Sequence, residues 1–151
     1  MKLRSESPYA ASKIAADYLA ITSYRSDNTP IVVARPFNTF GPRQSSRAVI
    51  PSIVVQALKN KDIKLGNLNT TRDFTYVTDV VDAFYKAAKS KVFHDIYNVG
   101  TGKPISVNYI VKSLGGKFVR IPKRPGEPDN SQANINKIRK ALNWKPKVNI
   151  D

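Results

Sequence analysis

The sequence predicts an α/β fold in which short parallel strands alternate with helices. The continuously apolar run Ile31–Ala34 and the mostly apolar run Ile96–Val99 are typical of strands that a parallel sheet buries on both faces. One helical pattern precedes the first run, and another, over Val80–Lys89, precedes the second. Helices placed between parallel strands form the crossover connections of this fold class.

The other elements follow from local signals. Ser7 is a good N-cap and Pro8 fits the first helical position, so a helix is expected from Pro8 to about Tyr24, where the polar segment RSDNTP ends it. Asp79 is expected to stabilise a helix start, and Trp144 to anchor the core. The remaining expected elements are a helix over Ala48–Leu58, strands over Ile63–Leu65, Asp73–Val77 and Phe118–Ile121, a helix over Val107–Leu114 capped by Ser106, and a helix over Lys137–Leu142 capped by Asn136.

Composition argues against several kinds of site. The 151 residues include no cysteine, which excludes disulfides and thiolate chemistry. The single histidine, His94, argues against a histidine-based metal site or a Ser-His-Asp triad, and we interpret it as a surface residue before a strand. No apolar run approaches a membrane span and no signal-peptide pattern opens the sequence, so a cytoplasmic protein is expected.

The formal net charge of +14 raises the alternative of nucleic-acid binding. A strongly basic domain gains affinity for nucleic acid by releasing counterions from the phosphates. The lysines are scattered, however, and form no single stripe interleaved with aromatic residues, which is the pattern of solvated helix faces and turns. Nucleic acid is therefore not the favoured partner, and a diphosphate-linked substrate would account for part of the charge.

Tyr9 and Lys13 form a candidate proton-transfer pair on the first helix. Residues four apart lie on one helical face, so the phenol and the ammonium can point into the same site. A free phenol has a pKa of about 10, and a neighbouring cation favours the phenolate that a general base requires. Tyr85 and Lys89 repeat the same spacing, so the spacing alone does not identify a site.

Five segments in order carry a resemblance to a known family. They are SPYAASK, ARPFNTFGPRQ, TRDFTYVTDVVDAF, YNVGTG and RPGE, within a region from about Ser7 to Val148. Taken together they resemble the C-terminal portion of the NAD-dependent epimerase/dehydratase family, which are extended short-chain dehydrogenase/reductases, of the nucleotide-sugar 4-epimerase or 4,6-dehydratase type.

The resemblance implies a partial Rossmann-like parallel sheet and a small mixed α/β substrate-binding domain. Residues 1–40 and 79–102 would be the remainder of the NAD-binding domain, and residues 41–78 and 103–151 the substrate domain. The family's N-terminal dinucleotide-binding half, with its glycine-rich turn, is missing from the 151 residues. Gly100 and Gly102 do not replace it, because Ile105 stands where the third glycine of the fingerprint belongs.

The resemblance also implies roles for individual residues. Tyr9 would be the base that takes the proton of the sugar 4-hydroxyl, and Lys13 would hold the ribose of the cofactor, which is expected to be NAD rather than NADP. Arg72 is assigned to the diphosphate, because a planar guanidinium matches phosphate oxygens bidentately. The other implied contacts are Pro36 and Phe37 with the nicotinamide end of the cofactor, and Asn38, Val49 through its amide, Asn98, Arg124 and Glu127 with the nucleotide sugar.

The favoured function is the catalytic-tyrosine and substrate-binding part of an NAD-dependent nucleotide-sugar epimerase or dehydratase, with a homodimer expected for the full-length enzyme. The 151-residue chain alone is expected to be inactive. A non-catalytic module that binds nucleotide sugars or nucleic acid, and an inactive truncated gene product, are the alternatives. The nucleotide, the sugar and the choice between epimerase and dehydratase stay open.

Overall fold

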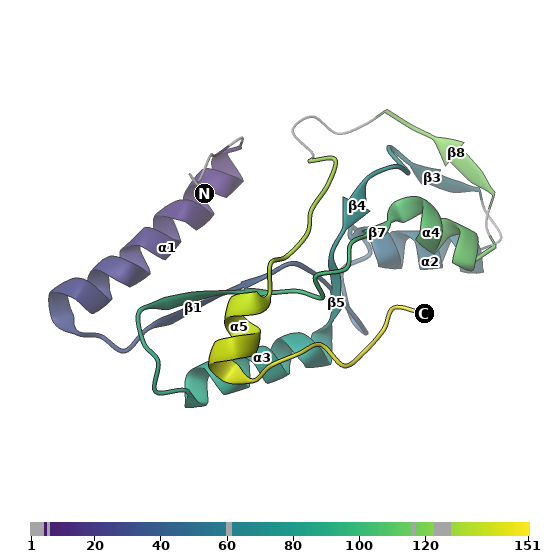
Figure 1. Cartoon of the computed structure of the whole chain (residues 1–151). Coiled ribbons are helices and arrows are strands. Elements are labelled where there is room, and N and C mark those ends of the chain that lie inside the picture. Colours follow the sequence, from purple (N-terminus) through teal and green to yellow (C-terminus); the bar gives the residue numbers. More distant parts are fainter. Residues whose placement is uncertain (1–4, 6, 60–61, 116, 123–127) are drawn as a thin grey trace.

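The computed structural model describes residues 5, 7–59, 62–115, 117–122 and 128–151, and it has the expected α/β class. Helices and strands alternate along the chain, and the strands form two-stranded pairs whose members lie far apart in the sequence (Figure 1). The elements are α1 (Pro8–Asp27), β1 (Val32–Pro36), β2 (Asn38–Phe40), α2 (Val49–Leu58), β3 (Ile63–Leu65), β4 (Thr71–Arg72), β5 (Phe74–Tyr76), α3 (Val77–Lys89), β6 (Asp95–Val99), β7 (Ile105–Ser106), α4 (Val107–Ser113), β8 (Phe118–Arg120) and α5 (Asn136–Leu142).

The two apolar runs form the parallel pair that the sequence predicts. β1 pairs with β6 from Val32 opposite Asp95 to Pro36 opposite Val99. The pairing continues for one further bond, because the Phe37 amide donates to the Val99 carbonyl at 2.9 Å. β2 then pairs in parallel with β5, so the chain leaves one pair of strands at its carboxyl end and enters another. Loops at the carboxyl ends of parallel strands are where this fold class binds ligands.

The expected strand over residues 73–77 corresponds to β5, and Asp73 lies between β4 and β5. β4 ends before Asp73 and β5 begins after it, and the two strands pair with different partners, β7 and β2. The Asp73 side chain is fully buried and accepts four hydrogen bonds, from the Thr101 amide and hydroxyl at 2.7 Å each, from the Gly102 amide at 2.8 Å and from the Ala133 amide at 3.0 Å. One carboxylate thereby holds three distant segments of the chain together.

Asp79 has a structural role that differs in detail from the one expected. α3 begins at Val77, so Asp79 lies in the first turn of the helix and is not its cap. It is 3% exposed, and its carboxylate accepts from the Lys147 and Val148 amides at 3.0 Å each. Its carbonyl accepts from the buried Trp144 indole at 3.2 Å. Asp79 therefore fixes the C-terminal segment to α3, and Trp144 is the core residue that the sequence predicts.

Buried apolar side chains form two clusters. The first contains Val80, Ala83, Tyr97 and Val99, and residues of the segment 133–144 complete it. The second contains Ile53, Ile63 and Phe74 together with residues of α4. The segment around α5 therefore packs against the β1–β6 pair, although it follows the β3–β8 pair in the sequence.

α1 begins as expected and is the least packed helix. Its N-cap, Ser7, accepts from the Ala10 amide at 3.1 Å, and the helix ends where Asn28 adopts a left-handed conformation. None of its residues is buried. The Arg35 guanidinium pairs with the Asp17 carboxylate at 2.6 Å and so ties the helix to β1. In Figure 1, α1 lies above β1 and α3 lies below it.

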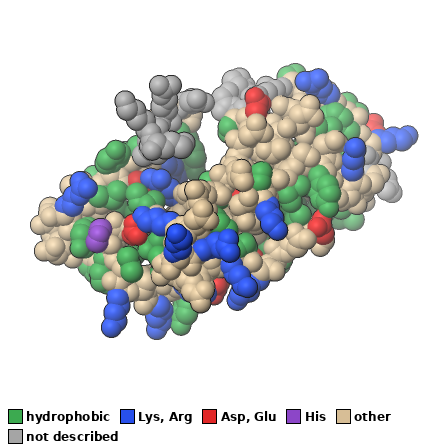
Figure 2. All heavy atoms as spheres, in the orientation of Figure 1, with side chains coloured by type: hydrophobic (Ala, Val, Ile, Leu, Met, Phe, Trp, Pro, Cys, Tyr) green, Lys and Arg blue, Asp and Glu red, His purple; other side chains and the backbone are tan. Residues whose placement is uncertain are grey.

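Lys and Arg side chains are spread over the face that Figure 2 shows, with few acidic side chains among them. His94 is exposed, as expected, and its ring stacks on Tyr24. Within the described residues there is no group of three or more His, Cys, Asp or Glu side chains that could hold a metal ion. None of the helices in that part of the chain is long and apolar enough to cross a membrane.

Tyr97 provides a pH-dependent prediction. Burial and the neighbouring Asp95 carboxylate raise the pKa of Tyr97 to about 12. An unfolded tyrosine ionises at a pH of about 10, so the unfolded chain loses this proton first. The free energy of unfolding should therefore be insensitive to Tyr97 below about pH 10 and fall by roughly 2–3 kcal/mol as the pH rises to about 12. Urea unfolding at about pH 8, 10 and 11 should show a shallower alkaline decline for Tyr97→Phe than for the wild type.

Candidate functional site

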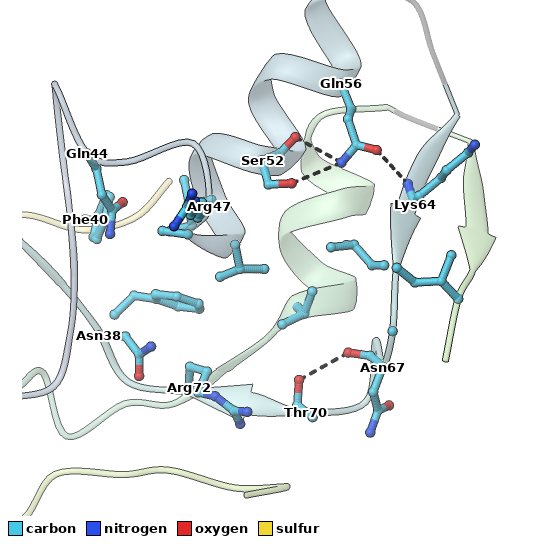
Figure 3. Close-up of a pocket in the computed structure, with 18 of the residues that line it drawn as sticks. Asn38, Phe40, Gln44, Arg47, Ser52, Gln56, Lys64, Asn67, Thr70 and Arg72 are labelled. Carbon is cyan, nitrogen blue, oxygen red and sulfur yellow. Dashed lines mark hydrogen bonds between the residues drawn. The ribbon is translucent and has the colours of Figure 1, made fainter. Parts of the chain in front are cut away.

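A pocket of about 480 Å³ lies between the start of α2 and the strands β2, β3 and β4. Its walls come from segments far apart in the sequence, at residues 38–56, 64–74, 107 and 121–122. Figure 3 shows its polar residues facing a common space. Among the described residues that line it are the cationic side chains of Arg47, Lys64 and Arg72, and none of these described residues carries a carboxylate. The pocket therefore suits an anionic ligand.

The start of α2 forms one wall of the pocket. Ala48 is the N-cap and has no side-chain oxygen, so the first-turn amides have no side-chain cap. Val49 is the first helical residue, and Ala48, Val49 and Ile50 all line the pocket. Ile53 is fully buried one turn later and fixes the helix against the second apolar cluster. Uncapped amides and the positive end of the helix dipole favour a negatively charged or hydrogen-bond-accepting group here.

Arg72 forms the opposite wall. It belongs to β4, which pairs in antiparallel fashion with β7, and it is only 7% exposed. Its guanidinium donates to the Thr71 carbonyl at 2.9 Å and to the Asp129 carbonyl at 3.3 Å. These bonds hold the planar group at the pocket, so its direction is largely set before a ligand arrives.

Asn38 is the first residue of β2 and follows the end of β1 by two residues, so it lies between the β1–β6 pair and the β2–β5 pair. Its amide donates to the Asp73 carbonyl at 3.0 Å, and its exposed side chain lines the pocket. Pro36 is exposed at the end of β1, whereas Phe37 packs against the first apolar cluster. The structure thus brings Asn38, Val49 and Arg72 to one pocket.

Tyr9 and Lys13 lie outside the set of residues that line this pocket. Tyr9 is 72% exposed in the first turn of α1, and the Lys13 ammonium lies 5.4 Å from the centre of its ring. Tyr85 is 62% exposed, and the Lys89 ammonium lies 5.8 Å from the centre of its ring. The two pairs therefore have nearly the same local geometry, and the side-chain geometry alone does not distinguish them.

The other expected site residues are separate from the pocket or outside the described residues. Asn98 lies in β6, and its side-chain amide donates to the Asn134 carbonyl at 3.5 Å. It does not line the pocket. Arg124 and Glu127 lie outside the residues that the structure describes.

The pocket also contains polar residues to which the sequence analysis assigned no role. They are Gln44, Arg47, Ser52, Gln56, Lys64, Asn67 and Thr70. Gln44 and Arg47 lie within or just after the quoted segment ARPFNTFGPRQ, which is the signal that could have identified them. The others carry no local signal, because they face the pocket only through the way α2 packs against β3 and β4.

Comparisons with known proteins show which family the chain belongs to. The family model described as GDP-mannose 4,6 dehydratase matches residues 1–151, which is the whole chain. The chain belongs to this family. Its membership confirms the resemblance to the epimerases and dehydratases that act on nucleotide sugars.

The similar family members include both reaction types. A UDP-glucuronate 4-epimerase of Thermodesulfobacterium geofontis is 32% identical over 96% of this chain and 47% of its own length. A human dTDP-D-glucose 4,6-dehydratase is 36% identical over 71% of this chain and 31% of its own length. The chain spans about half, or less, of the length of the curated family members that it matches.

Solved structures of the family confirm the fold. A UDP-glucuronic acid 4-epimerase from Bacillus cereus, in complex with UDP-glucuronic acid and NAD, has a TM-score of 0.89 and 27% identity over 99% of this chain and 52% of its own. A dTDP-glucose 4,6-dehydratase from Bacillus anthracis, in complex with NAD, has a TM-score of 0.89 and 28% identity over 97% of this chain and 49% of its own.

Proposed function

We propose that the pocket binds a nucleotide diphosphate sugar. The observation that carries this proposal is that Asn38, Val49 and Arg72, assigned to the substrate from separate motifs, line one pocket whose described lining residues include no carboxylate. The guanidinium of Arg72 and the uncapped amides of α2 offer charge-assisted hydrogen bonds to the diphosphate. Relatives that bind UDP-glucuronic acid share the fold and support the same ligand class.

The proposed reaction is oxidation of the sugar C4 hydroxyl, with Tyr9 as the base. The exposed phenol of Tyr9 would take the hydroxyl proton, and the Lys13 ammonium lies 5.4 Å from the centre of its ring. NAD, when bound, supplies the acceptor for the hydride that leaves C4. The nicotinamide end of NAD would be held by Tyr9, Lys13, Pro36 and Phe37. Tyr9 and Pro36 are exposed, and the Tyr9–Lys13 pair offers donor groups, which fits that role.

The wider organisation belongs to the same proposal. Residues 1–40 and 79–102 would belong to the NAD-binding domain, and residues 41–78 and 103–151 to the substrate domain. The full-length enzyme would be a cytoplasmic homodimer, and the exposed Tyr18 and Leu19 on α1 are available for such an interface. Size-exclusion chromatography with light scattering would measure its oligomeric state.

Direct binding measurements test the substrate class. Calorimetry of the 151-residue chain with UDP-glucose, dTDP-glucose and GDP-mannose should give saturable binding that weakens only modestly between low and physiological salt. A steep loss with salt, together with binding to an RNA or DNA oligonucleotide, would support the nucleic-acid module instead. The absence of binding by all three nucleotide sugars would overturn the proposal.

Arg72→Ala should weaken binding of UDP by about 10- to 100-fold, because one charge-assisted, bidentate contact is lost. Binding of uridine, which has no phosphate, should stay within about twofold of the wild type. Calorimetry with both ligands measures the two effects, and circular dichroism checks that the variant is folded. An equal loss for UDP and uridine would assign Arg72 a packing role.

The isolated chain is not expected to bind NAD tightly or to turn over, because its relatives are about twice as long. Titration of the 151-residue chain with NAD measures this directly. A dissociation constant in the micromolar range would contradict the prediction. If a full-length protein binds nucleotide sugars without turnover, the result would favour the non-catalytic binding module. The position of Tyr9 outside the pocket lining supports that alternative.

A further inference from the structure

Gln44 is held in one orientation by the turn that follows β2. Its amide donates to the Gly41 carbonyl at 3.3 Å, which closes the turn. Its side-chain Nε2 donates to the Thr39 carbonyl at 2.7 Å. A carbonyl oxygen can only accept, so the nitrogen of the carboxamide must face Thr39 and the oxygen must face away from it.

The Gln44 side-chain oxygen has no hydrogen-bond partner among the described residues, and it is buried. A buried acceptor without a donor is costly and rare in folded proteins. Gln56, which lines the same pocket, provides the contrast. Its Nε2 donates to the Ser52 carbonyl and hydroxyl at 3.1 and 3.2 Å, and its oxygen accepts from the Lys64 amide at 2.9 Å. Gln56 is therefore fully engaged within the protein, whereas Gln44 has an unused acceptor.

The position of Gln44 indicates which part of a ligand it would meet. Figure 3 shows Gln44 with Asn38 and Phe40 at one end of the pocket and Lys64 and Asn67 at the other. Arg47 and Arg72 lie between the two ends. If the arginines hold the diphosphate, the end beside Asn38 receives the sugar, because Asn38 follows the carboxyl end of β1.

We propose that Gln44 selects the sugar of the bound nucleotide sugar by accepting a hydrogen bond from an O–H or N–H group on it. This inference rests on the proposed function of the pocket. The terminal torsion of a glutamine is broad, so a small rotation turns the oxygen toward the ligand while Nε2 keeps its bond to Thr39. A sugar that lacks the donor leaves the oxygen unpaired, which is the physical basis of discrimination.

Fluorinated sugars test this acceptor in the wild-type chain. Fluorine replaces a hydroxyl at similar size but cannot donate a hydrogen bond. Calorimetry with UDP-glucose, with UDP-N-acetylglucosamine and with analogues fluorinated at one sugar position at a time should show about a tenfold loss of affinity at one position. The position of that loss, and the affinity for the N-acetylated sugar, distinguish a hydroxyl donor from an amide donor. Equal binding of all these ligands would overturn the proposal.

Variants at Gln44 assign the effect to its oxygen. Gln44→Lys keeps a donor for the Thr39 carbonyl and removes the acceptor, so it should abolish the discrimination against the sensitive analogue. The added positive charge favours the anionic diphosphate, so the affinity for UDP should not fall. Gln44→Glu keeps an acceptor and should retain the discrimination. Gln56→Lys is the matched control, and any effect on affinity should be the same for every sugar.

The outcomes separate the two proposals. If UDP-glucose and UDP both fail to bind the wild-type chain, the proposed function is wrong and the role of Gln44 is wrong with it. If both bind but Gln44→Lys weakens UDP as much as UDP-glucose, or leaves the discrimination intact, the pocket assignment stands and the role of Gln44 is overturned.

Discussion

Tyr9→Phe in the full-length enzyme is expected to lower turnover by about 10²- to 10⁴-fold, which is the usual contribution of one general acid–base group. The affinity for the nucleotide sugar should stay within about twofold, because Tyr9 does not line the pocket that holds the proposed substrate contacts. Steady-state kinetics measures turnover, and calorimetry measures binding on the same preparation.

Tyr85→Phe is the matched control for this experiment. It removes a phenol of similar exposure that stands at a similar distance from a lysine ammonium, on α3 rather than α1. Its turnover should equal that of the wild type. Equal losses in both variants, or a parallel loss of turnover and binding in Tyr9→Phe, would show that Tyr9 does not act as the base.

Asp73→Asn is expected to lower the free energy of unfolding by about 3–5 kcal/mol. The buried carboxylate accepts from the Thr101 amide and hydroxyl, the Gly102 amide and the Ala133 amide, and all four are donors. An asparagine would direct its NH₂ group at one or two of them, so a bond is replaced by a donor–donor repulsion and buried groups lose their partners. Urea unfolding monitored by circular dichroism measures the loss.

The same carboxylate-to-amide change at Asp82 is the control. Asp82 forms only a partly exposed pair with Lys86 on α3 at 3.7 Å, so its loss should change the free energy of unfolding by about 0.5 kcal/mol or less. A loss at Asp73 no larger than that at Asp82 would contradict the view that this residue organises the fold.

Much of the fold could be predicted because its signals are local. Ser7 and Ser106 cap helices with their own side chains, and each accepts from an amide three residues later. The apolar runs at β1 and β6 require burial on both faces, which a parallel pair provides. The motifs also predicted three of the residues that line the pocket, Asn38, Val49 and Arg72.

The features that could not be predicted depend on contacts between residues far apart in the chain. The sequence predicts Asp73 as the first residue of a strand, whereas its buried carboxylate accepts from the distant Thr101, Gly102 and Ala133 amides. Asp79 reads as a helix cap, but its partners are the Lys147 and Val148 amides. In both cases the requirement that a buried carboxylate be hydrogen-bonded overrides the local preference.

By itself the sequence determined the α/β class, most helix and strand positions and the family, because periodicity, caps and motifs act over a few residues. Only the tertiary structure decided which residues share a pocket, which carboxylates hold segments together and which acceptor is left unpaired. Gln44 and Gln56 are chemically identical in the sequence, and they differ only in the donors that the fold places around them. Hydrogen-bond satisfaction is a property of the assembled neighbourhood, so no local pattern shows which of the two side-chain oxygens is left without a donor.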